Sequence, residues 1–340
     1  MSTEQVAVTT KKDWTSSQEV RWCPGCGDYG ILLAVQQLMP ELGVAPENTV
    51  FVSGIGCSSR FPYYMNTYGM HSIHGRAPAI ATGVATARPD LDVWVITGDG
   101  DGLSIGGNHL IHALRRNVNL NILLFNNRIY GLTKGQYSPT SEVGKVTKST
   151  PMGSVDAPFN PLSVALGAEA SFVARTHDLD RKHMQETFKA AHAHQGASFV
   201  EIYQNCNVFN DGQFDGVTKK ASRDEMMIDL AHGEPILFGN ENQRGVMQGT
   251  DGFLHIVEVA DVGLDRILVH DEKNEHPSLA FALARLNSDD HSPTPFGVFR
   301  NIERAEYTKS VSDQVLAASE ANGPGDLNTL LASNGTWTVN

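Results

Sequence analysis

Short apolar runs alternate with longer amphipathic segments over the first two thirds of the chain. Each run is bounded by glycine or polar residues, which is typical of a buried strand. The predicted strands cover residues 49–54, 92–97, 120–125, 171–176 and 198–203. The predicted helices cover residues 29–39, 77–89, 104–116, 161–170 and 179–195. Strand–helix–strand units of this length imply parallel pairing with right-handed crossovers. Residues 19–235 are therefore predicted to form one doubly wound α/β domain with a mostly parallel sheet.

The two ends of the chain lack this regularity. Residues 1–18 are polar and unpatterned, and we predict a mobile N-terminal arm there. Residues 236–340 are predicted to form an irregular C-terminal extension, with strands only at 253–260 and 265–270. Inside the domain, residues 130–162 are rich in Gly, Ser, Thr and Pro. A loop of this length in a compact domain is usually functional.

Charge and hydropathy exclude two classes of protein. The net charge of the 340 residues is −12, and the excess of acidic residues lies after residue 220. This is not the basic footprint of a nucleic-acid-binding protein. No apolar run is long enough to span a membrane, and the N-terminus lacks the apolar core of an export signal. We therefore expect a cytoplasmic protein whose thiols stay reduced.

A glycine-rich turn follows the predicted strand 92–97. The strand ends in Gly98-Asp99-Gly100, and the next strand ends in Asn126-Asn127. Glycines and a helix N-terminus suit a phosphate group, and the carboxyl ends of neighbouring parallel strands lie together. Asp99 and Asn127 are thus predicted to bind Mg²⁺ with phosphate oxygens. Asp101 could form hydrogen bonds with the loop, but we expect it to be the N-cap of the helix at 104–116.

The chain has four cysteines, Cys23, Cys26, Cys57 and Cys206. The first two form a C-x2-C pair, whereas the others stand singly after predicted strands. Four cysteines suit either a tetrahedral zinc or an iron–sulfur cluster. The wide separation of the last two argues against a self-contained zinc module. Spacing alone leaves an iron–sulfur cluster, a zinc site and unrelated thiols open.

Several segments together resemble the β subunit of the 2-oxoacid:ferredoxin oxidoreductases over residues 20–235. The GDG…NN arrangement resembles the thiamine diphosphate motif of that family. The matching segments are WCPGCG (22–27), GIGCSSR (54–60), HGRAPAIATG (74–83), TGDGD (97–101), FNNRIYGLTKGQYSPTS (125–141) and NCN (205–207). The stretch 133–161 looks more like the members that oxidise 2-oxoglutarate than like those that oxidise pyruvate.

The resemblance implies the pyrophosphate-binding domain of the thiamine diphosphate fold and three cofactors: thiamine diphosphate, Mg²⁺ and one [4Fe–4S] cluster. It implies that all four cysteines bind the cluster and that the Ile129 carbonyl joins Asp99 and Asn127 on Mg²⁺. The implied contacts of thiamine diphosphate are Ile55, Gly56, Cys57, Ser58, His74, Gly98, Asp99, Gly100, Asp101, Asn127, Ile129, Gly131, Leu132 and Thr133.

Several basic side chains are candidates for contact with the substrate. His74 and Arg76 are the candidate catalytic residues, although His74 would serve equally well as a structural hydrogen-bonding partner. The alternative for Arg76 is an ion pair with an acidic side chain at the surface. A second carboxylate on the substrate would need a cation, and Lys134 is the main candidate, with Lys145 and Lys148 as others.

The implied reaction converts 2-oxoglutarate, coenzyme A and oxidised ferredoxin into succinyl-CoA, CO2 and reduced ferredoxin. The resemblance also implies an α subunit that carries the pyrimidine-binding domain, in an α2β2 or larger assembly. The extension 236–340 would pack on this α subunit. Ferredoxin is expected to dock near Lys11, Lys12 and Arg21. The alternatives are another 2-oxo acid such as pyruvate, a non-redox thiamine decarboxylase or carboligase with structural zinc, and a non-catalytic module.

Overall fold

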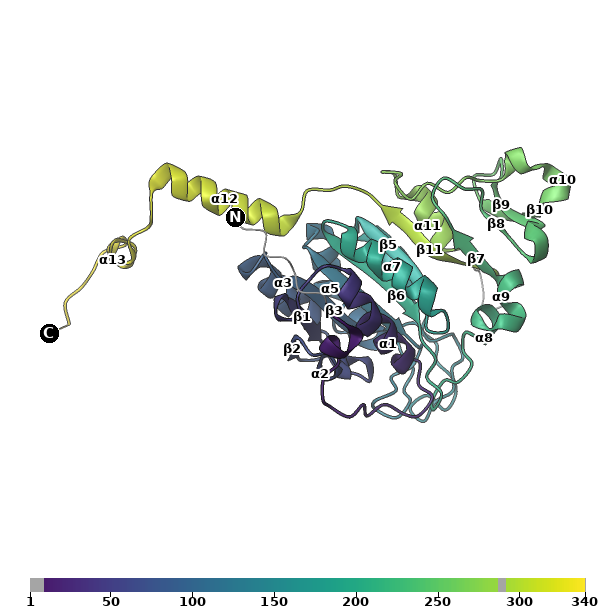
Figure 1. Cartoon of the computed structure of the whole chain (residues 1–340), viewed down its shortest axis with the longest axis horizontal. Helices are drawn as coiled ribbons and strands as arrows, with labels where there is room; N and C mark the ends of the chain where they lie inside the picture. The colour runs from purple at the N-terminus through teal and green to yellow at the C-terminus, as the bar shows by residue number, and fades with distance from the viewer. Residues whose placement is uncertain (1–8, 287–291, 340) are drawn as a thin grey trace.

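The computed structural model describes residues 9–286 and 292–339. Its main body is an eight-stranded sheet with the strand order β2-β1-β3-β4-β6-β5-β11-β7 (Figure 1). The strands are β1 Thr49–Ser53, β2 Tyr68–His71, β3 Asp92–Gly98, β4 Leu120–Asn126, β5 Phe172–His177, β6 Ala197–Tyr203, β7 Met227–Leu230 and β11 Thr294–Asn301. Neighbours pair in parallel except β5 and β11, which pair antiparallel. The predicted doubly wound, mostly parallel α/β fold is confirmed.

Helices cover both faces of this sheet, which explains why the central strands are continuous apolar runs. Every residue of β1, β4, β5 and β6 is buried. Helices α1 Asp28–Leu38 and α7 Arg181–Ala193 pack on one face, against aromatic residues such as Phe51 and Trp94. Helices α3 Ala77–Ala87, α5 Gly107–Arg116 and α6 Pro161–Gly167 pack on the other face, against residues such as Val95.

Residues 9–18 differ from the mobile arm that we predicted. A short 3-10 helix, Lys11–Trp14, places the Trp14 side chain in the core with no exposed surface. Thr15 forms a β-bridge with Met65, and the Ser16 hydroxyl donates to the Tyr63 carbonyl at 2.6 Å. Burial of one large aromatic side chain holds this segment on the domain. Residues 1–8 lie outside the described part of the chain.

The C-terminal third is more regular than predicted, and part of it completes the main sheet. A boundary at residue 235 would cut through this sheet, because β11 lies between β5 and β7. A separate antiparallel sheet contains β8 Leu237–Phe238, β9 Arg244–Gln248 and β10 Leu254–Glu258. The strand predicted at 253–260 is thus confirmed as β10. The strand predicted at 265–270 is wrong, because a 3-10 turn at Leu264–Arg266 and a single bridge at Val269 occupy this stretch.

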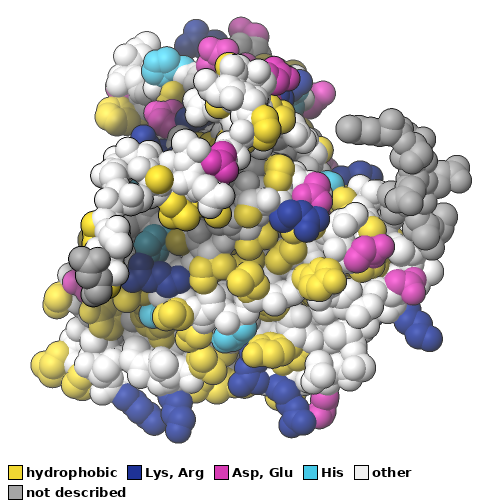
Figure 2. Space-filling model, turned by 90° about the vertical axis from the view of Figure 1, so that its left-hand side faces the viewer, with side chains coloured by type: hydrophobic (Ala, Val, Ile, Leu, Met, Phe, Trp, Pro, Cys, Tyr) yellow, Lys and Arg dark blue, Asp and Glu magenta, His cyan; other side chains and the backbone are white. Residues whose placement is uncertain are grey.

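The last described residues leave the body of the molecule. Helix α12, Tyr307–Asn322, extends away from the sheet, and the short helix α13, Leu327–Ala332, lies still farther out (Figure 1). Their exposed apolar side chains are Val315, Leu316, Leu327, Leu330 and Leu331, followed by Trp337 and Val339. Viewed from the side of this tail, hydrophobic side chains gather across the middle of the molecular face (Figure 2).

Candidate functional site

The turn after β3 is a helix and not an open loop. Residues Asp99–Leu103 form the short helix α4, and α5 begins only at Gly107. The helix in the structure therefore begins three residues later than the helix predicted at 104–116. Asp101 lies inside α4, so its predicted role as an N-cap is wrong.

Asp101 instead joins three segments by hydrogen bonds. One carboxylate oxygen accepts the backbone N–H groups of Ile55 at 3.0 Å and Gly75 at 2.7 Å. The other accepts the Thr97 hydroxyl at 2.7 Å. The Nδ1 atom of His74 lies 2.7 Å from the first oxygen. This buried carboxylate thus holds the loops after β1 and β2 against the end of β3.

These loops enclose a cavity of about 750 Å³ at the carboxyl ends of β1, β3 and β4. All fourteen side chains and glycines that we expected to contact thiamine diphosphate line this cavity. Their contacts with the cofactor stay a prediction, but the structure brings them together. Gly100 could not be replaced by a larger residue, because a Cβ atom there would lie 2.2 Å from the Tyr130 ring. The Tyr130 hydroxyl donates to the Gly100 carbonyl at 2.8 Å.

The two predicted metal ligands lie at neighbouring strand ends, as expected. Asp99 is almost fully buried, and burial raises the pKa of its carboxyl group even though hydrogen bonds from Ser138 and Thr140 oppose the shift. A buried carboxylate of this kind needs a cation to compensate its charge. The Asn127 side-chain oxygen accepts the Ile129 N–H at 3.2 Å. Carboxylate and amide oxygens are suitable ligands for Mg²⁺.

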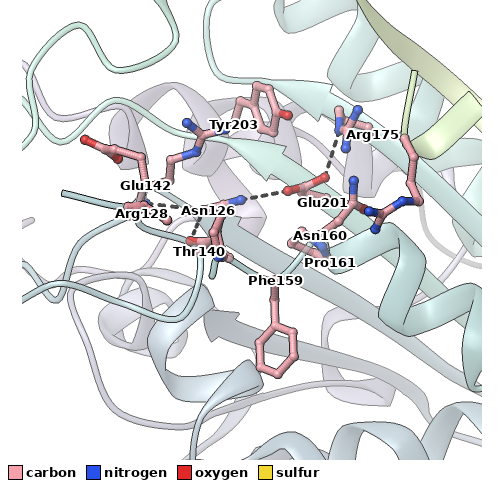
Figure 3. A pocket seen from close by; sticks show the side chains of 13 residues that line it. Asn126, Arg128, Thr140, Glu142, Phe159, Asn160, Pro161, Arg175, Glu201 and Tyr203 are labelled. Carbon is pink, nitrogen blue, oxygen red and sulfur yellow. Dashed lines mark hydrogen bonds and ion pairs between the residues drawn. The ribbon is translucent and has the colours of Figure 1, made fainter. Parts of the chain in front are cut away.

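A chain of buried polar groups extends from Asp99 into a second cavity, of about 570 Å³. Figure 3 shows the part of this chain from Thr140 to Arg175. The Thr140 hydroxyl lies 2.7 Å from an Asp99 oxygen and 2.9 Å from the Asn126 amide oxygen. Asn126 donates to Glu201 at 2.7 Å, and Glu201 forms an ion pair with Arg175 at 2.7 Å. Both members of this pair are about 1% exposed. Thr140 and Asn126 thus link the metal-ligand candidate to a fully buried ion pair.

The four cysteines converge on a third cavity, of about 250 Å³, which all four line. A Cβ atom built on Gly131 would lie 3.5 Å from Cys57 Sγ and 3.6 Å from Cys206 Sγ, so these two sulfurs face one point. Burial raises the pKa of the Cys57 thiol to about 12 and also raises that of Cys26. Buried thiolates therefore require a cationic partner such as iron or zinc.

The cysteine geometry bears on the choice between zinc and a cluster. Within the described residues, no three Cys, His, Asp or Glu side chains are placed to hold one common metal ion. Structural zinc needs all four sulfurs on a single ion, whereas each cysteine of a [4Fe–4S] cluster binds a different iron. The structure brings the four cysteines to one cavity, and the choice between a zinc ion and a cluster stays a prediction.

The cofactor cavity and the cysteine cavity share a wall. Cys57, Asn127, Gly131 and Leu132 line both of them. Cys23 is solvent-exposed, so the cysteine cavity also reaches the molecular surface. The cofactor cavity, the cysteine cavity and the surface thus lie in sequence.

The structure separates the basic candidates. His74 lines the cofactor cavity, and because its Nδ1 atom faces Asp101, only its Nε2 atom is available to another group. Arg76 is exposed, lies outside this cavity lining and contacts His109. Lys134 lines the cysteine cavity and not the cofactor cavity.

The other two lysines are also outside the cofactor cavity lining. Lys145 contacts the side chains of Glu142 and Asn210, which already compensate its charge, and Lys148 is exposed. No described lysine or arginine therefore lines the cofactor cavity.

Sequence reasoning missed several residues of the site. Thr140, Tyr130 and Gln204 contact the predicted site residues Asp99, Gly100 and Asn127, and Asn126 contacts Thr140. Asn126 could have been found as the neighbour of Asn127, and Gln204 as the residue that ends the strand beside β4. Thr140 and Tyr130 lie in the long loop before α6. This loop has no periodic pattern, so the sequence does not predict which of its side chains face the site.

Comparison with known proteins agrees with this geometry. Residues 54–202 match the family of the thiamine pyrophosphate enzymes, C-terminal TPP binding domain. No helix in the described ranges has the length and apolar character to cross a membrane.

Individual relatives extend the likeness over nearly the whole chain. The 2-oxoglutarate oxidoreductase subunit KorB of Mycobacterium tuberculosis is 60% identical over 330 residues, which cover 96% of this chain and 88% of that protein. The β subunit of 2-oxoacid:ferredoxin oxidoreductase 1 from Aeropyrum pernix is 47% identical over 190 residues, which cover 56% of this chain and 60% of that protein.

A solved structure matches with a TM-score of 0.77 and 33% identity over 98% of both chains. It is the 2-oxoglutarate:ferredoxin oxidoreductase from Magnetococcus marinus with 2-oxoglutarate, coenzyme A and succinyl-CoA bound. Its likeness includes the C-terminal third, which the thiamine family match leaves out. On these grounds the chain belongs to the family of the 2-oxoacid oxidoreductase β subunits.

Proposed function

We propose that this chain is the β subunit of a 2-oxoglutarate:ferredoxin oxidoreductase. The enzyme would convert 2-oxoglutarate and coenzyme A to succinyl-CoA and CO2 and transfer two electrons to ferredoxin, one at a time. The observation that carries this proposal is the wall shared by the cofactor cavity and the cysteine cavity. A one-electron carrier held by the four cysteines would lie directly beside the cofactor, where it could accept the electrons of an oxidative decarboxylation.

Thiamine diphosphate, when bound, supplies an electron sink for cleavage of the bond to the substrate carboxylate. In this chain, Asp99, Asn127 and the Ile129 carbonyl would hold Mg²⁺, and α4 would hold the pyrophosphate. The negative charge of the buried Asp99 carboxylate would compensate part of the positive charge of Mg²⁺. His74 would present Nε2 to the substrate, in an orientation that Asp101 maintains. Tyr130 closes the cavity beside Gly100.

The four cysteines, Cys23, Cys26, Cys57 and Cys206, would hold a [4Fe–4S] cluster. Cys57 lines both cavities, and the exposed Cys23 lies two residues after Arg21 in the sequence. The cluster would therefore lie between the site of decarboxylation and the surface. This position suits a one-electron carrier that delivers electrons to a soluble partner such as ferredoxin.

Substrate choice rests on the relatives and not on a cation in this cavity. The Mycobacterium tuberculosis relative is named for 2-oxoglutarate, and the Magnetococcus marinus structure contains 2-oxoglutarate and coenzyme A. No described lysine or arginine lines the cofactor cavity. We therefore expect the group that binds the second carboxylate of the substrate, and the pyrimidine-activating glutamate, to come from an α subunit. A cytoplasmic α2β2 enzyme is the simplest assembly.

The C-terminal tail is proposed to bind this α subunit. Helix α12 and helix α13 expose apolar side chains, and isolated helices of these lengths are marginal in water. Deletion of residues 306–340 should release the α subunit in size-exclusion chromatography while the sheet still folds. Retention of the α subunit, or loss only of self-association between β subunits, would contradict the proposal.

Iron and acid-labile sulfide, measured on the complex purified without oxygen, test the proposed function. We expect about four of each per β chain, as one [4Fe–4S] cluster requires. Cys206→Ser should lower both, whereas Ser59→Ala should not, because it removes a buried hydroxyl that has no hydrogen-bonding partner among the described residues. Zinc without sulfide would contradict the redox function and support a non-redox thiamine enzyme.

A further inference from the structure

Gln204 is a buried residue that contacts both candidate metal sites. It directly follows β6, is about 1% exposed, and lines the cysteine cavity. Its Nε2 atom lies 3.3 Å from Cys26 Sγ and 2.7 Å from the Asn205 carbonyl oxygen. Its Oε1 atom lies 2.7 Å from Asn127 Nδ2. A single side chain therefore joins a predicted cluster ligand to a predicted magnesium ligand.

The hydrogen-bonding partners determine which way both amides point. The Asn205 carbonyl can only accept, so the NH2 group of Gln204 must face it and the neighbouring Cys26 sulfur. The Gln204 oxygen then faces Asn127, which must present its own NH2 group in return. The Asn127 oxygen is thereby directed to the opposite side, where it accepts the Ile129 N–H.

Two backbone contacts hold the position of these residues without orienting their amides. The Gln204 N–H donates to the Asn126 carbonyl at 2.9 Å, which continues the β4–β6 pairing. The Asn127 carbonyl accepts a hydrogen bond from the Asn210 side chain at 2.9 Å. The orientation of the Asn127 amide depends instead on Gln204, which accepts from its NH2 group, and on the Ile129 N–H, which donates to its oxygen. The contact with Gln204 is the shorter of the two, at 2.7 Å against 3.2 Å.

We propose that Gln204 is a positioning residue that serves both sites at once. Its oxygen orients Asn127 so that the Asn127 oxygen is offered to Mg²⁺, and its NH2 group donates to the Cys26 thiolate. A hydrogen bond to a cluster sulfur stabilises the reduced, more negative cluster and so raises its reduction potential. The inference rests on the proposed function, because it assumes the cluster and the magnesium site.

Gln204→Met tests both roles in the purified αβ complex, because methionine has a similar volume and no amide. We expect the apparent Kd for thiamine diphosphate with Mg²⁺ to rise about tenfold, the lower range for loss of a partner behind a metal ligand. We also expect a more negative cluster potential in a redox titration followed by electron paramagnetic resonance. Gln36→Met is the matched control, since Gln36 is a buried glutamine that bonds only the Tyr64 carbonyl.

Gln204→Glu separates the two roles. A carboxylate can still accept from Asn127, so the Kd should change less than in Gln204→Met. It cannot donate to Cys26, so the potential should fall at least as far.

A Gln204→Met complex whose Kd and potential match those of Gln36→Met would overturn the inference, and so would a change in Kd alone. A wild-type complex without iron would instead contradict the proposed function, and the Kd would still decide the role toward Asn127.

Discussion

At the scale of single residues, the site depends on buried polar groups that each satisfy several partners. Asp101 is about 2% exposed and accepts hydrogen bonds from two backbone N–H groups, from Thr97 and from His74. A carboxylate suits this place because it only accepts, and every neighbour there can donate. The same residue fixes the ring of His74, so one side chain determines both the loop positions and the atom that a substrate would meet.

Asp101→Ala should therefore damage the site more than Asp101→Asn. Alanine leaves buried donors without acceptors, and each such donor costs about 1–3 kcal/mol. Asparagine keeps one oxygen for Ile55 and Gly75. We expect a larger loss of unfolding free energy and of thiamine diphosphate affinity for the alanine variant, measured by denaturant titration and calorimetry. Equal losses in the two variants would show that the acceptor oxygen is not the important feature.

His177 makes the stability of the chain depend on pH. Its side chain is fully buried, and neither ring nitrogen has a hydrogen-bonding partner among the described residues. Burial, with a smaller effect of His183, lowers the pKa of His177 from 6.5 to about 4. Between these pH values the unfolded chain binds a proton that the folded chain does not. The unfolding free energy therefore falls as the pH falls from 6.5 to 4.

His177→Leu should make that pH dependence shallower. The histidine contributes a slope that amounts to roughly 3 kcal/mol over the window, at 1.36 kcal/mol per pKa unit. Leucine has no proton to gain and no polar atom to leave unpaired. Urea unfolding at several pH values measures the slope for both proteins. An unchanged slope would mean that His177 is protonated equally in the folded and unfolded chain.

At the scale of elements, the sequence predicts the central strands well because they are buried on both faces. Continuous apolar runs identified β1, β3, β4, β5 and β6, and parallel topology alone placed Asp99 near Asn127. Strand β11 was missed because Pro295 and Gly297 interrupt its pattern and a register shift follows at Val298. The position of Thr140 could not be predicted, because it depends on how a loop without periodicity folds back over β3 and β4.

The ion pair between Arg175 of β5 and Glu201 of β6 should stabilise the fold through its burial. Glu201→Gln leaves the Arg175 guanidinium buried without a carboxylate, which should cost about 3–5 kcal/mol of unfolding free energy. The exposed pair Lys182–Glu186, at 3.6 Å on α7, is the matched control. Glu186→Gln should cost less than about 1 kcal/mol. Comparable losses in denaturant unfolding would show that burial does not strengthen the Glu201 pair.

At the scale of the whole molecule, opposite charges are unevenly distributed. The net charge is −12, yet Lys11, Lys12 and Arg21 are exposed near the first two cysteines in the sequence. Arg21 is also paired with Glu19 at 2.7 Å. An acidic electron acceptor would be repelled by the net negative charge and attracted to these three side chains, which would guide its approach to the proposed cluster.

Reversal of these charges should slow electron transfer without changing decarboxylation. For Lys11→Glu/Lys12→Glu/Arg21→Glu we expect kcat/KM for ferredoxin to fall by roughly tenfold at low salt, and the difference to shrink at high salt. Reduction of a small uncharged dye should stay the same. Lys182→Glu/Lys189→Glu on α7 provides the control. A triple variant that transfers electrons to ferredoxin at the wild-type rate would place the docking surface elsewhere.

The place of β11 has a consequence for how the protein folds during synthesis. The outer edge of β5 pairs with a strand that the ribosome makes more than a hundred residues later. At ordinary rates of translation this delay is on the order of ten seconds. During that time a nascent domain with its cofactor loops complete still has an open, apolar edge. The main sheet of this subunit can therefore close only near the end of translation, and a chain released before residue 294 would keep the edge of β5 unpaired.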